Sequence, residues 1–330
     1  MSTATAPCTI RAGRLAFAVD HRWAKLPSGK AFGLTHNMAE SRDGRLFIAH
    51  LNGSRIEDAV FIFDHSGKFL GSWGEQYATG AHGITLAEEG GKEVLWLANT
   101  SLREVVKTDL EGRVLLIIRR PPHEAYKKHE EFSPTEVAVA PDGTVFIADG
   151  YGKPYVHRYT SAGKYLSSFG GEGIGPGQMR QPHGIFIDCR GAAPRVLIAN
   201  RQNLRIDAFS LDGAFQGTVI GTEHLRFPCS ARSRGKELWV PDLFSRISVF
   251  DGQDQLIGHL GDYAEGRPFR DGWGTFGATI PGLVGYPHIA EAAKLDGKFS
   301  SPHGLHCAKD GSVYLMEWMD GGRVTKLTPA

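Results

Sequence analysis

The stretch GTVFIAD, residues 143–149, is a short apolar run that ends in a polar residue, and five other segments repeat it. An unbroken run of β-branched and aromatic residues of this length is typical of a strand buried on both faces. The first five segments start about 42–51 residues apart, which predicts an array of equivalent units. The six segments are GRLFIAH (44–50), KEVLWLAN (92–99), GTVFIAD (143–149), PRVLIAN (194–200), KELWVPD (236–242) and GSVYLME (311–317).

Five of these segments precede a hairpin of two alternating strands that turns on Gly, Asp or Ser, such as HRYTSAGKYLSSF (157–169). The sixth is followed by one strand only, in GRVTKLTPA (322–330). The missing outer strand is available in RLAFAVD (14–20), and pairing it into the last unit would close a ring and remove its open edge. The sequence therefore predicts an all-β fold: a six-bladed β-propeller formed by a single domain, residues 1–330, and closed by its N-terminal strand.

Charge and composition exclude several classes of protein. The 37 Lys and Arg residues and 36 Asp and Glu residues give a net charge of +1, which argues against nucleic-acid and membrane partners. No apolar run approaches the roughly 18 residues of a spanning helix. The start of the chain lacks a basic segment followed by an apolar one, so we expect no signal peptide and a cytoplasmic protein. The four cysteines show no CxxC spacing and are expected to be reduced.

Aligning the six units places one residue of each at the mouth of the central channel. Four of these six residues are histidines, although the chain has only 14 histidines in 330 residues. One such histidine would more simply be a hydrogen-bonding residue at a turn. Several imidazoles that converge on one axis suit zinc or another divalent transition metal. The channel-mouth residues are His36, His82, Thr135, His183, Cys229 and His303.

A second aligned set closes the buried strands. Its Asp and Asn members are expected to cap the following turns through hydrogen bonds to the main chain. Directly beyond it lie Tyr151 and Arg201, two loop residues on the rim that the histidines should face. Either is an ordinary surface residue by type, but this position would let them handle a proton and a charge. The strand-closing residues are His50, Asn99, Asp149, Asn200, Asp242 and Glu317.

The stretches FSPTEVAVAPDGTVFIADGYGKPYVHRYTSAGKYLSSFG (132–170) and GPGQMRQPHGIFID (175–188) resemble the central part of the peptidyl-α-hydroxyglycine α-amidating lyases. These are six-bladed propellers related to NHL repeats, and they carry a catalytic zinc. The resemblance covers most of residues 80–330. Carried over by position, it implies that His82, His183 and His303 bind the metal, that Tyr151 is the base, and that Arg201 matches an arginine of the family.

This resemblance implies a zinc-dependent lyase that cleaves the C–N bond of a small-molecule substrate, an α-hydroxy amide or ureide. The chain also departs from the family. His50 is followed by Leu51 where the family has an arginine, and Arg55 is the residue that could replace it in substrate binding. Ser301 stands in place of a methionine, and Gly304 in place of an acidic residue tied to a structural calcium. His36 is an extra imidazole, either a fourth ligand or, as we favour, a neighbour of the metal.

Residues 261–298 make up the long gap before the last buried strand, and they contain no run that could form a seventh blade. Their density of aromatic residues predicts an inserted lid over the channel mouth, in which Trp273 or Tyr286 contacts substrate and Arg267 or Arg270 meets an anionic group. A self-packed cap or a dimer contact is the simpler reading, and a homo-oligomer stays open. Two other functions also stay open: a lactonase-like metal-dependent hydrolase, and an NHL-repeat module that binds a protein.

Overall fold

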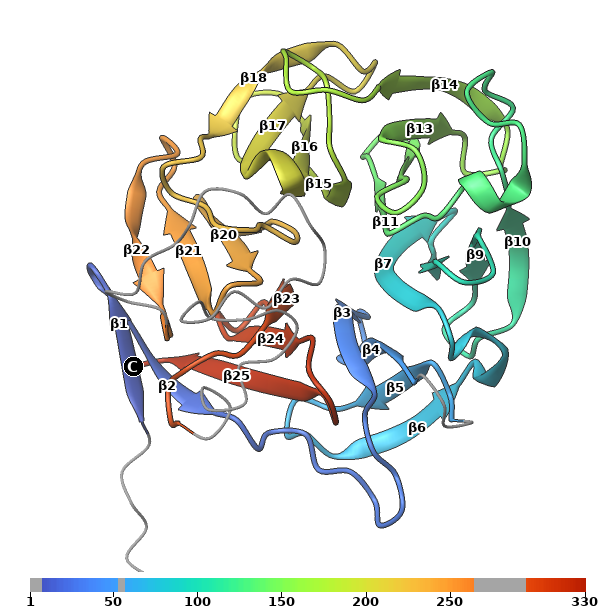
Figure 1. Ribbon diagram of the computed structural model, residues 1–330. Coiled ribbons are helices and arrows are strands. Elements are labelled where there is room, and N and C mark those ends of the chain that lie inside the picture. The colour runs from blue at the N-terminus through green and yellow to red at the C-terminus, as the bar shows by residue number, and fades with distance from the viewer. Residues whose placement is uncertain (1–7, 53–56, 264–294) are drawn as a thin grey trace, which may run out of the picture.

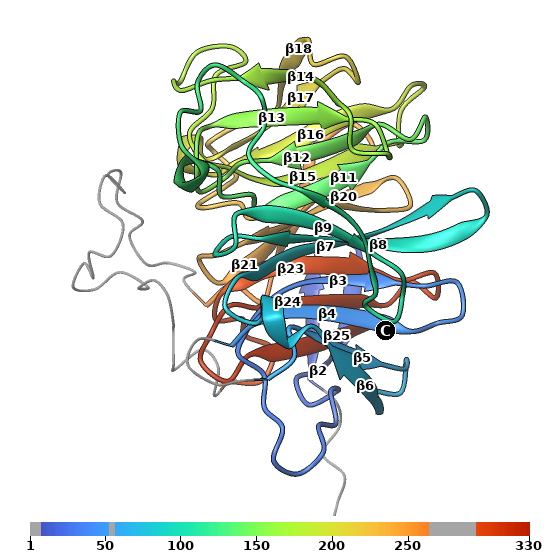
Figure 2. The same cartoon turned by 90° about the vertical axis from the view of Figure 1, so that its right-hand side faces the viewer.

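The computed structural model describes residues 8–52, 57–263 and 295–330, and these residues form six antiparallel sheets. The sheets stand as blades around a central channel, with β3, β7, β11, β15 and β23 nearest the axis (Figure 1). Seen from the side, the strands run between the two faces of a disc (Figure 2). The predicted all-β, six-bladed propeller is confirmed.

Each of the first three blades has four strands in chain order from the channel outwards. Blade one consists of β3 (Leu34–Glu40), β4 (Leu46–Leu51), β5 (Val60–Phe63) and β6 (Phe69–Trp73). Blade two consists of β7 (Ala81–Glu89), β8 (Lys92–Asn99), β9 (Glu104–Thr108) and β10 (Val114–Ile118). Blade three consists of β11 (Glu136–Val139), β12 (Val145–Ala148), β13 (Tyr155–Tyr159) and β14 (Tyr165–Gly170).

Blades four and five follow the same order, and the last blade is completed by the start of the chain. Blade four consists of β15 (Pro182–Asp188), β16 (Arg195–Asn200), β17 (Arg205–Phe209) and β18 (Phe215–Ile220). Blade five consists of β19 (Arg232–Arg234), β20 (Glu237–Asp242), β21 (Arg246–Phe250) and β22 (Leu256–Leu260). Blade six consists of β23 (Pro302–Cys307), β24 (Val313–Glu317), β25 (Arg323–Pro329), β2 (Leu15–Asp20) and β1 (Thr9–Ala12).

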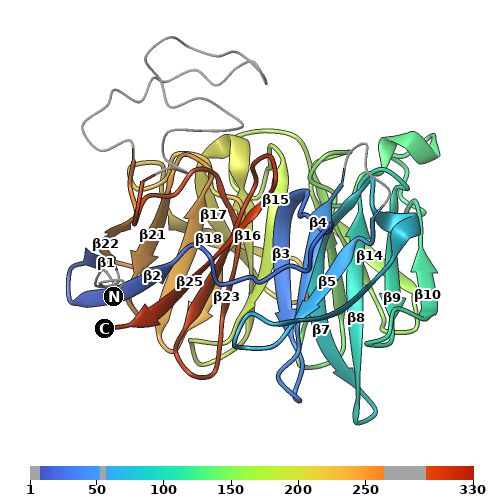
Figure 3. The ribbon, with the colours of Figure 1, turned by 90° about the horizontal axis from the view of Figure 1, so that it is seen from below.

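The ring closes where β2 pairs antiparallel with β25, and Phe17 stands opposite Pro329 in that pairing. Figure 3 shows the two strands side by side at the edge of the disc. Closure by the N-terminal strand is therefore confirmed. The structure adds β1 as a fifth strand of this sheet, which the sequence did not predict.

Short elements complete the description. Within the described residues, three single turns of 3₁₀ helix connect strands: η1 (Glu75–Tyr77), η2 (His129–Glu131) and η3 (Arg201–Asn203). No helix within the described ranges has the length and apolar character needed to cross a membrane. All four cysteines belong to the described residues, and each is a free thiol.

The repeated buried strands hold neighbouring blades together. Side chains alternate between the two faces of a strand, so one strand serves two interfaces. In β4, Phe47 and Ala49 pack in a cluster with blade two, whereas Leu46 and Ile48 pack in a cluster with blade six. Burial on both faces explains why these strands are continuously apolar, and each large side chain contributes roughly 1.5–3 kcal/mol.

The strand-closing residues tie the approach to each channel strand to its blade. The Asp149 carboxylate accepts hydrogen bonds from the main-chain N–H of Ser133 at 2.7 Å and of Lys153 at 2.8 Å. Asp242 accepts from the N–H of Phe227 at 2.6 Å in the same way. The contact with Lys153 is the expected capping of the following turn, whereas Ser133 and Phe227 lie in the segments that lead into the channel mouth. The contacts with Ser133 and Phe227 fix the positions of the channel-mouth residues Thr135 and Cys229, which lie two residues further along the chain.

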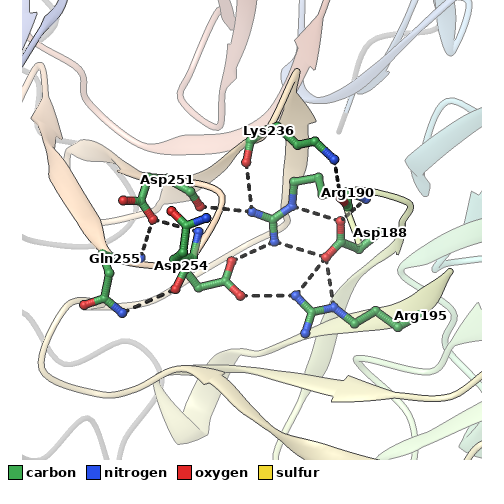
Figure 4. A network of polar contacts seen from close by, with 8 residues as sticks. Asp188, Arg190, Arg195, Lys236, Asp251, Asp254 and Gln255 are labelled. Carbon is green, nitrogen blue, oxygen red and sulfur yellow. Dashed lines mark hydrogen bonds and ion pairs between the residues drawn. The ribbon is translucent and has the colours of Figure 1, made fainter. Parts of the chain in front are cut away.

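At the opposite end of β15 from His183, an ion-pair network joins blades four and five (Figure 4). The Asp188 carboxylate pairs with Arg190 at 2.9 Å and with Arg195 at 2.9 Å. Both guanidinium groups also reach Asp254 in the β21–β22 turn, at 2.7 and 3.1 Å. Burial acts to raise the pKa of Asp188, but its hydrogen bonds with Arg190 and Arg195 outweigh that effect and hold the pKa below its usual range.

Candidate metal centre

Three histidines from three blades meet in the channel. His82, His183 and His303 lie near the starts of β7, β15 and β23, and each is 5% exposed or less. The centres of their rings are 4.8 Å apart for His82 and His183, 4.9 Å for His82 and His303, and 4.7 Å for His183 and His303. The predicted ligands thus come together at one point on the propeller axis.

The main chain of the next blade orients each ring. Nδ1 of His82 lies 2.7 Å from the carbonyl oxygen of Thr135, and Nδ1 of His183 lies 2.8 Å from that of Cys229. Nδ1 of His303 lies 3.1 Å from the carbonyl oxygen of His36. A carbonyl can only accept, so Nδ1 donates in each case and Nε2 is left with a lone pair. Metal-binding histidines in proteins are commonly held in this way.

The glycine after each of these histidines allows that approach. A Cβ atom on Gly83 would lie 2.6 Å from the Thr135 carbonyl oxygen. A Cβ atom on Gly184 would lie closer still to the Cys229 carbonyl oxygen, and one on Gly304 would crowd the His36 carbonyl in the same manner. The His-Gly repeat therefore places an imidazole and its acceptor in contact across a blade interface. His36 is followed by Asn37 rather than by glycine. Nδ1 of His36 lies 2.8 Å from the carbonyl oxygen of Leu34, in the same strand.

The protonation state and the hydrogen bonding of these imidazoles suit a metal ion. Burial lowers the pKa of His82, His183 and His303 well below the usual 6.5, and burial lowers that of His36 to about 3. Neutral imidazoles are the form that binds a metal. Nε2 of His303 is buried and has no hydrogen-bond partner among the described residues. Leaving such a group unsatisfied costs about 1–3 kcal/mol, and a metal bond would satisfy it.

The described residues contain two groups of three side chains whose donor atoms all lie within 4.8 Å of one another. One group is His36, His82 and His303, and the other is His183, Cys229 and His303. His303 belongs to both groups, whereas His82 belongs only to the first and His183 only to the second, so the three predicted ligands are divided between the two groups. The groups also bring in His36 and Cys229. Neither group contains a carboxylate, the ligand type that calcium prefers. The alignment of the six repeats placed Cys229 among the channel-mouth residues but assigned it no role. Its thiol, a common metal ligand, was the feature that could have suggested one.

Tyr151 points its hydroxyl into the same space. The oxygen lies 3.0 Å from Nε2 of His183 and 3.2 Å from Nε2 of His82, while 39% of the residue stays exposed. Arg201 is 1% exposed; one of its amino groups lies 3.4 Å from the phenol oxygen, and its guanidinium group lies 5.4 Å from the centre of the ring. Tyr151 therefore reaches the histidines directly, and Arg201 reaches Tyr151.

The pKa of Tyr151 depends on two opposing effects. Burial of the hydroxyl raises this pKa, and the opposing effect of the Arg201 charge does not cancel it, since desolvation of a phenolate outweighs one guanidinium group. The lyase resemblance implies that a bound metal and Arg201 together depress the pKa of Tyr151, and that expectation for the metal-bound protein stays a prediction.

Gln181 holds Arg201 and was missed from the sequence. Its side-chain oxygen accepts from Nε of Arg201 at 2.9 Å, and its main-chain oxygen accepts from the Arg201 N–H at 3.1 Å. The residue has a φ of 59°, a left-handed conformation that non-glycine residues seldom adopt. Gln181 stands immediately before the Pro-His-Gly sequence, and this position was the one feature of the sequence that could have pointed to a role near the site.

A pocket of about 920 Å³ opens above the histidines, and Tyr151, Arg180, Gln202 and Trp318 line it together with His36 and His82. This volume is in the range of small-molecule sites. Arg55, Arg267, Arg270, Trp273 and Tyr286, which the sequence predicts to contact substrate, lie outside the described residues. So does most of the predicted lid at 261–298.

Comparisons with known proteins bear on this site. No protein-family model matches the chain. The chain is 29% identical over 271 residues to the peptidylglycine alpha-amidating monooxygenase of Rattus norvegicus, a match that covers 78% of this chain and 25% of that protein. It is 25% identical over 155 residues to peptidyl-alpha-hydroxyglycine alpha-amidating lyase 2 of Drosophila melanogaster, covering 46% of this chain and 36% of that protein. The chain thus spans about a quarter of the length of the first of these relatives.

Part of the chain also matches a different kind of protein: it is 29% identical over 168 residues to the E3 ubiquitin-protein ligase TRIM71 of Rattus norvegicus, covering 50% of this chain and 17% of that one.

Among solved structures, a streptogramin B lyase superposes with a TM-score of 0.58 at 12% identity over 95% of this chain and 98% of that one. A luciferin-regenerating enzyme gives 0.58 at 12% identity, over 94% and 95%. The chain is a six-bladed β-propeller that resembles the peptidyl-α-hydroxyglycine α-amidating lyases.

Proposed function

We propose that this protein is a metal-dependent lyase that cleaves the C–N bond of a small α-hydroxy amide or ureide. The observation that carries the proposal is the meeting of three buried imidazoles, each with its Nε2 lone pair free of a proton, beside a tyrosine hydroxyl and a buried arginine. The similarity to the amidating lyase of Drosophila melanogaster supports the same class of reaction.

His82, His183 and His303 would hold the metal, which we propose to be zinc. Such an ion supplies a Lewis acid for an oxygen of the substrate. The imidazole donors and the absence of carboxylates from both donor groups favour a transition metal over calcium. The carbonyls behind the three rings keep the ligands in the required tautomer.

Tyr151 would move the proton in this reaction. As a phenolate it takes the proton of the substrate hydroxyl, the O–H electron pair forms the second bond of the carbonyl, and the C–N electron pair leaves with nitrogen. As a phenol it returns that proton to the nitrogen, so the products are an aldehyde or keto acid and an amide, and the tyrosine regains its starting state. Arg201 favours the phenolate because its guanidinium group lies against the ring and the phenol oxygen.

Metal analysis of the purified full-length protein tests the proposal. We expect about one zinc per chain in the wild type and loss of most of it in His183→Ala, with the fold retained by circular dichroism. His306→Ala is the matched control, because His306 lies three residues beyond His303 in β23 and binds the Glu40 carboxylate at 2.7 Å. That variant should keep its metal.

The alternative functions predict other outcomes. Calcium in the wild type would favour a lactonase-like hydrolase. A protein without metal would favour a binding module. Full metal content in His183→Ala would exclude the ligand assignment.

A further inference from the structure

Cys229 occupies the channel-mouth position of blade five, where blades one, two, four and six carry histidine. Its main-chain oxygen already serves the site as the acceptor for Nδ1 of His183, at 2.8 Å. Its side chain is fully buried, at 0% exposure. The thiol thus projects from a backbone position that the site fixes.

The sulfur lies among the donor atoms of the candidate metal centre. Sγ of Cys229, and one ring nitrogen each of His183 and His303, all lie within 4.8 Å of one another. A small cavity of about 10 Å³, roughly the space that one water needs, lies at this point. The cavity is lined by His36, His82, His183, Cys229 and His303, among other residues. The partnerless Nε2 of His303 is a second sign that a ligand belongs there.

Arg201 connects the thiol to the proposed base. One of its amino groups lies 3.7 Å from Sγ of Cys229, and the other lies 3.4 Å from the Tyr151 oxygen. A guanidinium group in this place would stabilise a thiolate through a charge-assisted hydrogen bond. Sγ also donates to the Phe227 carbonyl oxygen at 3.8 Å, and burial raises the pKa of the thiol to about 11 despite Arg201, so a metal that binds the sulfur would displace this proton.

We infer that Cys229 is a sulfur ligand of the metal, binding the same ion as His183 and His303. The inference rests on the proposed function, because it assumes that the histidines hold a metal. A thiolate makes the donor set softer, and it selects zinc and other thiophilic ions over magnesium, manganese and calcium. His82 stays the third imidazole ligand of the proposed function, and its Nε2 lies 3.2 Å from the Tyr151 hydroxyl.

Cobalt spectroscopy of the full-length protein tests the sulfur ligand without any assay of activity. Co²⁺ added to metal-free wild type should give visible ligand-field bands together with an intense near-ultraviolet sulfur-to-cobalt charge-transfer band. Cys229→Ser should lose the charge-transfer band, keep ligand-field bands, and bind Co²⁺ at least about tenfold more weakly. Cys189→Ser and Cys307→Ser are the controls, and both should keep the full spectrum.

The spectrum separates the two proposals. Ligand-field bands without a charge-transfer band in the wild type would overturn the assignment of Cys229 and leave the histidine site standing. Absence of both would overturn the metal site itself, and with it this inference. Because the decisive spectrum is that of the wild type, the result does not depend on the stability of the variant.

Discussion

Gly184 separates His183 from Ile185 at a point where blade five comes into contact with blade four. Its Cβ position lies 2.5 Å from the Cα of Ser230 and closer still to the Cys229 carbonyl oxygen. We expect Gly184→Ala to push that carbonyl away, release the His183 ring and weaken metal binding at least about tenfold, the lower range for loss of a supporting contact. Competition with a chelator of known affinity measures this. Gly71→Ala is the control, because nothing lies within 4 Å of its Cβ position; equal metal affinity in the two variants would refute the argument.

Tyr151 gives a second test at the scale of one residue. Tyr151→Phe keeps the ring and removes the oxygen that faces His82 and His183. We expect turnover of an N-acyl α-hydroxyglycine to fall at least ~10²-fold, as for loss of a general acid–base group. The melting temperature should change little, since one hydrogen bond contributes only about 1 kcal/mol. Turnover near that of the wild type would return Tyr151 to the ordinary surface residues.

Individual residues show which parts of the candidate site could be predicted from the sequence. The histidines, Tyr151 and Arg201 could be located because each recurs at, or follows, an aligned position of the repeat. Gln181 and the thiol of Cys229 could not be assigned, because their roles depend on contacts between blades rather than on spacing. The raised pKa of Tyr151 follows from the burial of one oxygen, a quantity that no motif encodes.

At the scale of elements, ion pairs through Asp188 join the β15–β16 turn of blade four to the β21–β22 turn of blade five. The side chains of Asp188 and Arg190 are 1% and 5% exposed. Breaking such a buried pair from one side is strongly destabilising, so Asp188→Asn should lower the free energy of unfolding by roughly 3 kcal/mol at pH 7. Urea denaturation measures it. Glu88→Gln removes the exposed pair with Arg42, and this control should have an effect below about 1 kcal/mol.

The same ion pair predicts a dependence on pH. The pKa of Asp188 in the folded protein lies below its ordinary value of 3.8, so its stabilising effect is full above that value and disappears as pH falls through the folded value. The difference in stability between wild type and Asp188→Asn should therefore be constant from pH 7 to pH 5 and shrink below pH 4. A difference that stays constant down to pH 3 would contradict the assigned role of the carboxylate.

The elements themselves were largely predictable. Each buried strand is apolar on both faces because it packs against two neighbours, and that requirement is visible in the sequence as the VFIAD-like runs. β1 was missed because its four residues, TIRA, carry only a weak apolar pattern and pair with an outer strand.

At the scale of the whole molecule, one seam joins the two parts of blade six. Phe17 of β2 is 1% exposed and packs against Trp239 of blade five, with ring centres 5.3 Å apart. Phe17→Ala should lower the free energy of unfolding by about 3–5 kcal/mol, the range for a buried aromatic. Urea denaturation again measures it, with the exposed Leu70→Ala as control. A loss below 1 kcal/mol would mean that the seam does not hold the ring closed.

The carbonyl behind each imidazole has a consequence for how the site would respond to genetic change. Blade three supplies no candidate metal ligand, yet its Thr135 carbonyl orients His82. Every amino acid carries that carbonyl, so Thr135→Ala would keep it in place and would not test whether His82 depends on it. Replacing the amide that follows Thr135 by an ester would weaken the carbonyl as an acceptor. This change would measure how much the carbonyl contributes to holding His82, which side-chain mutagenesis cannot detect.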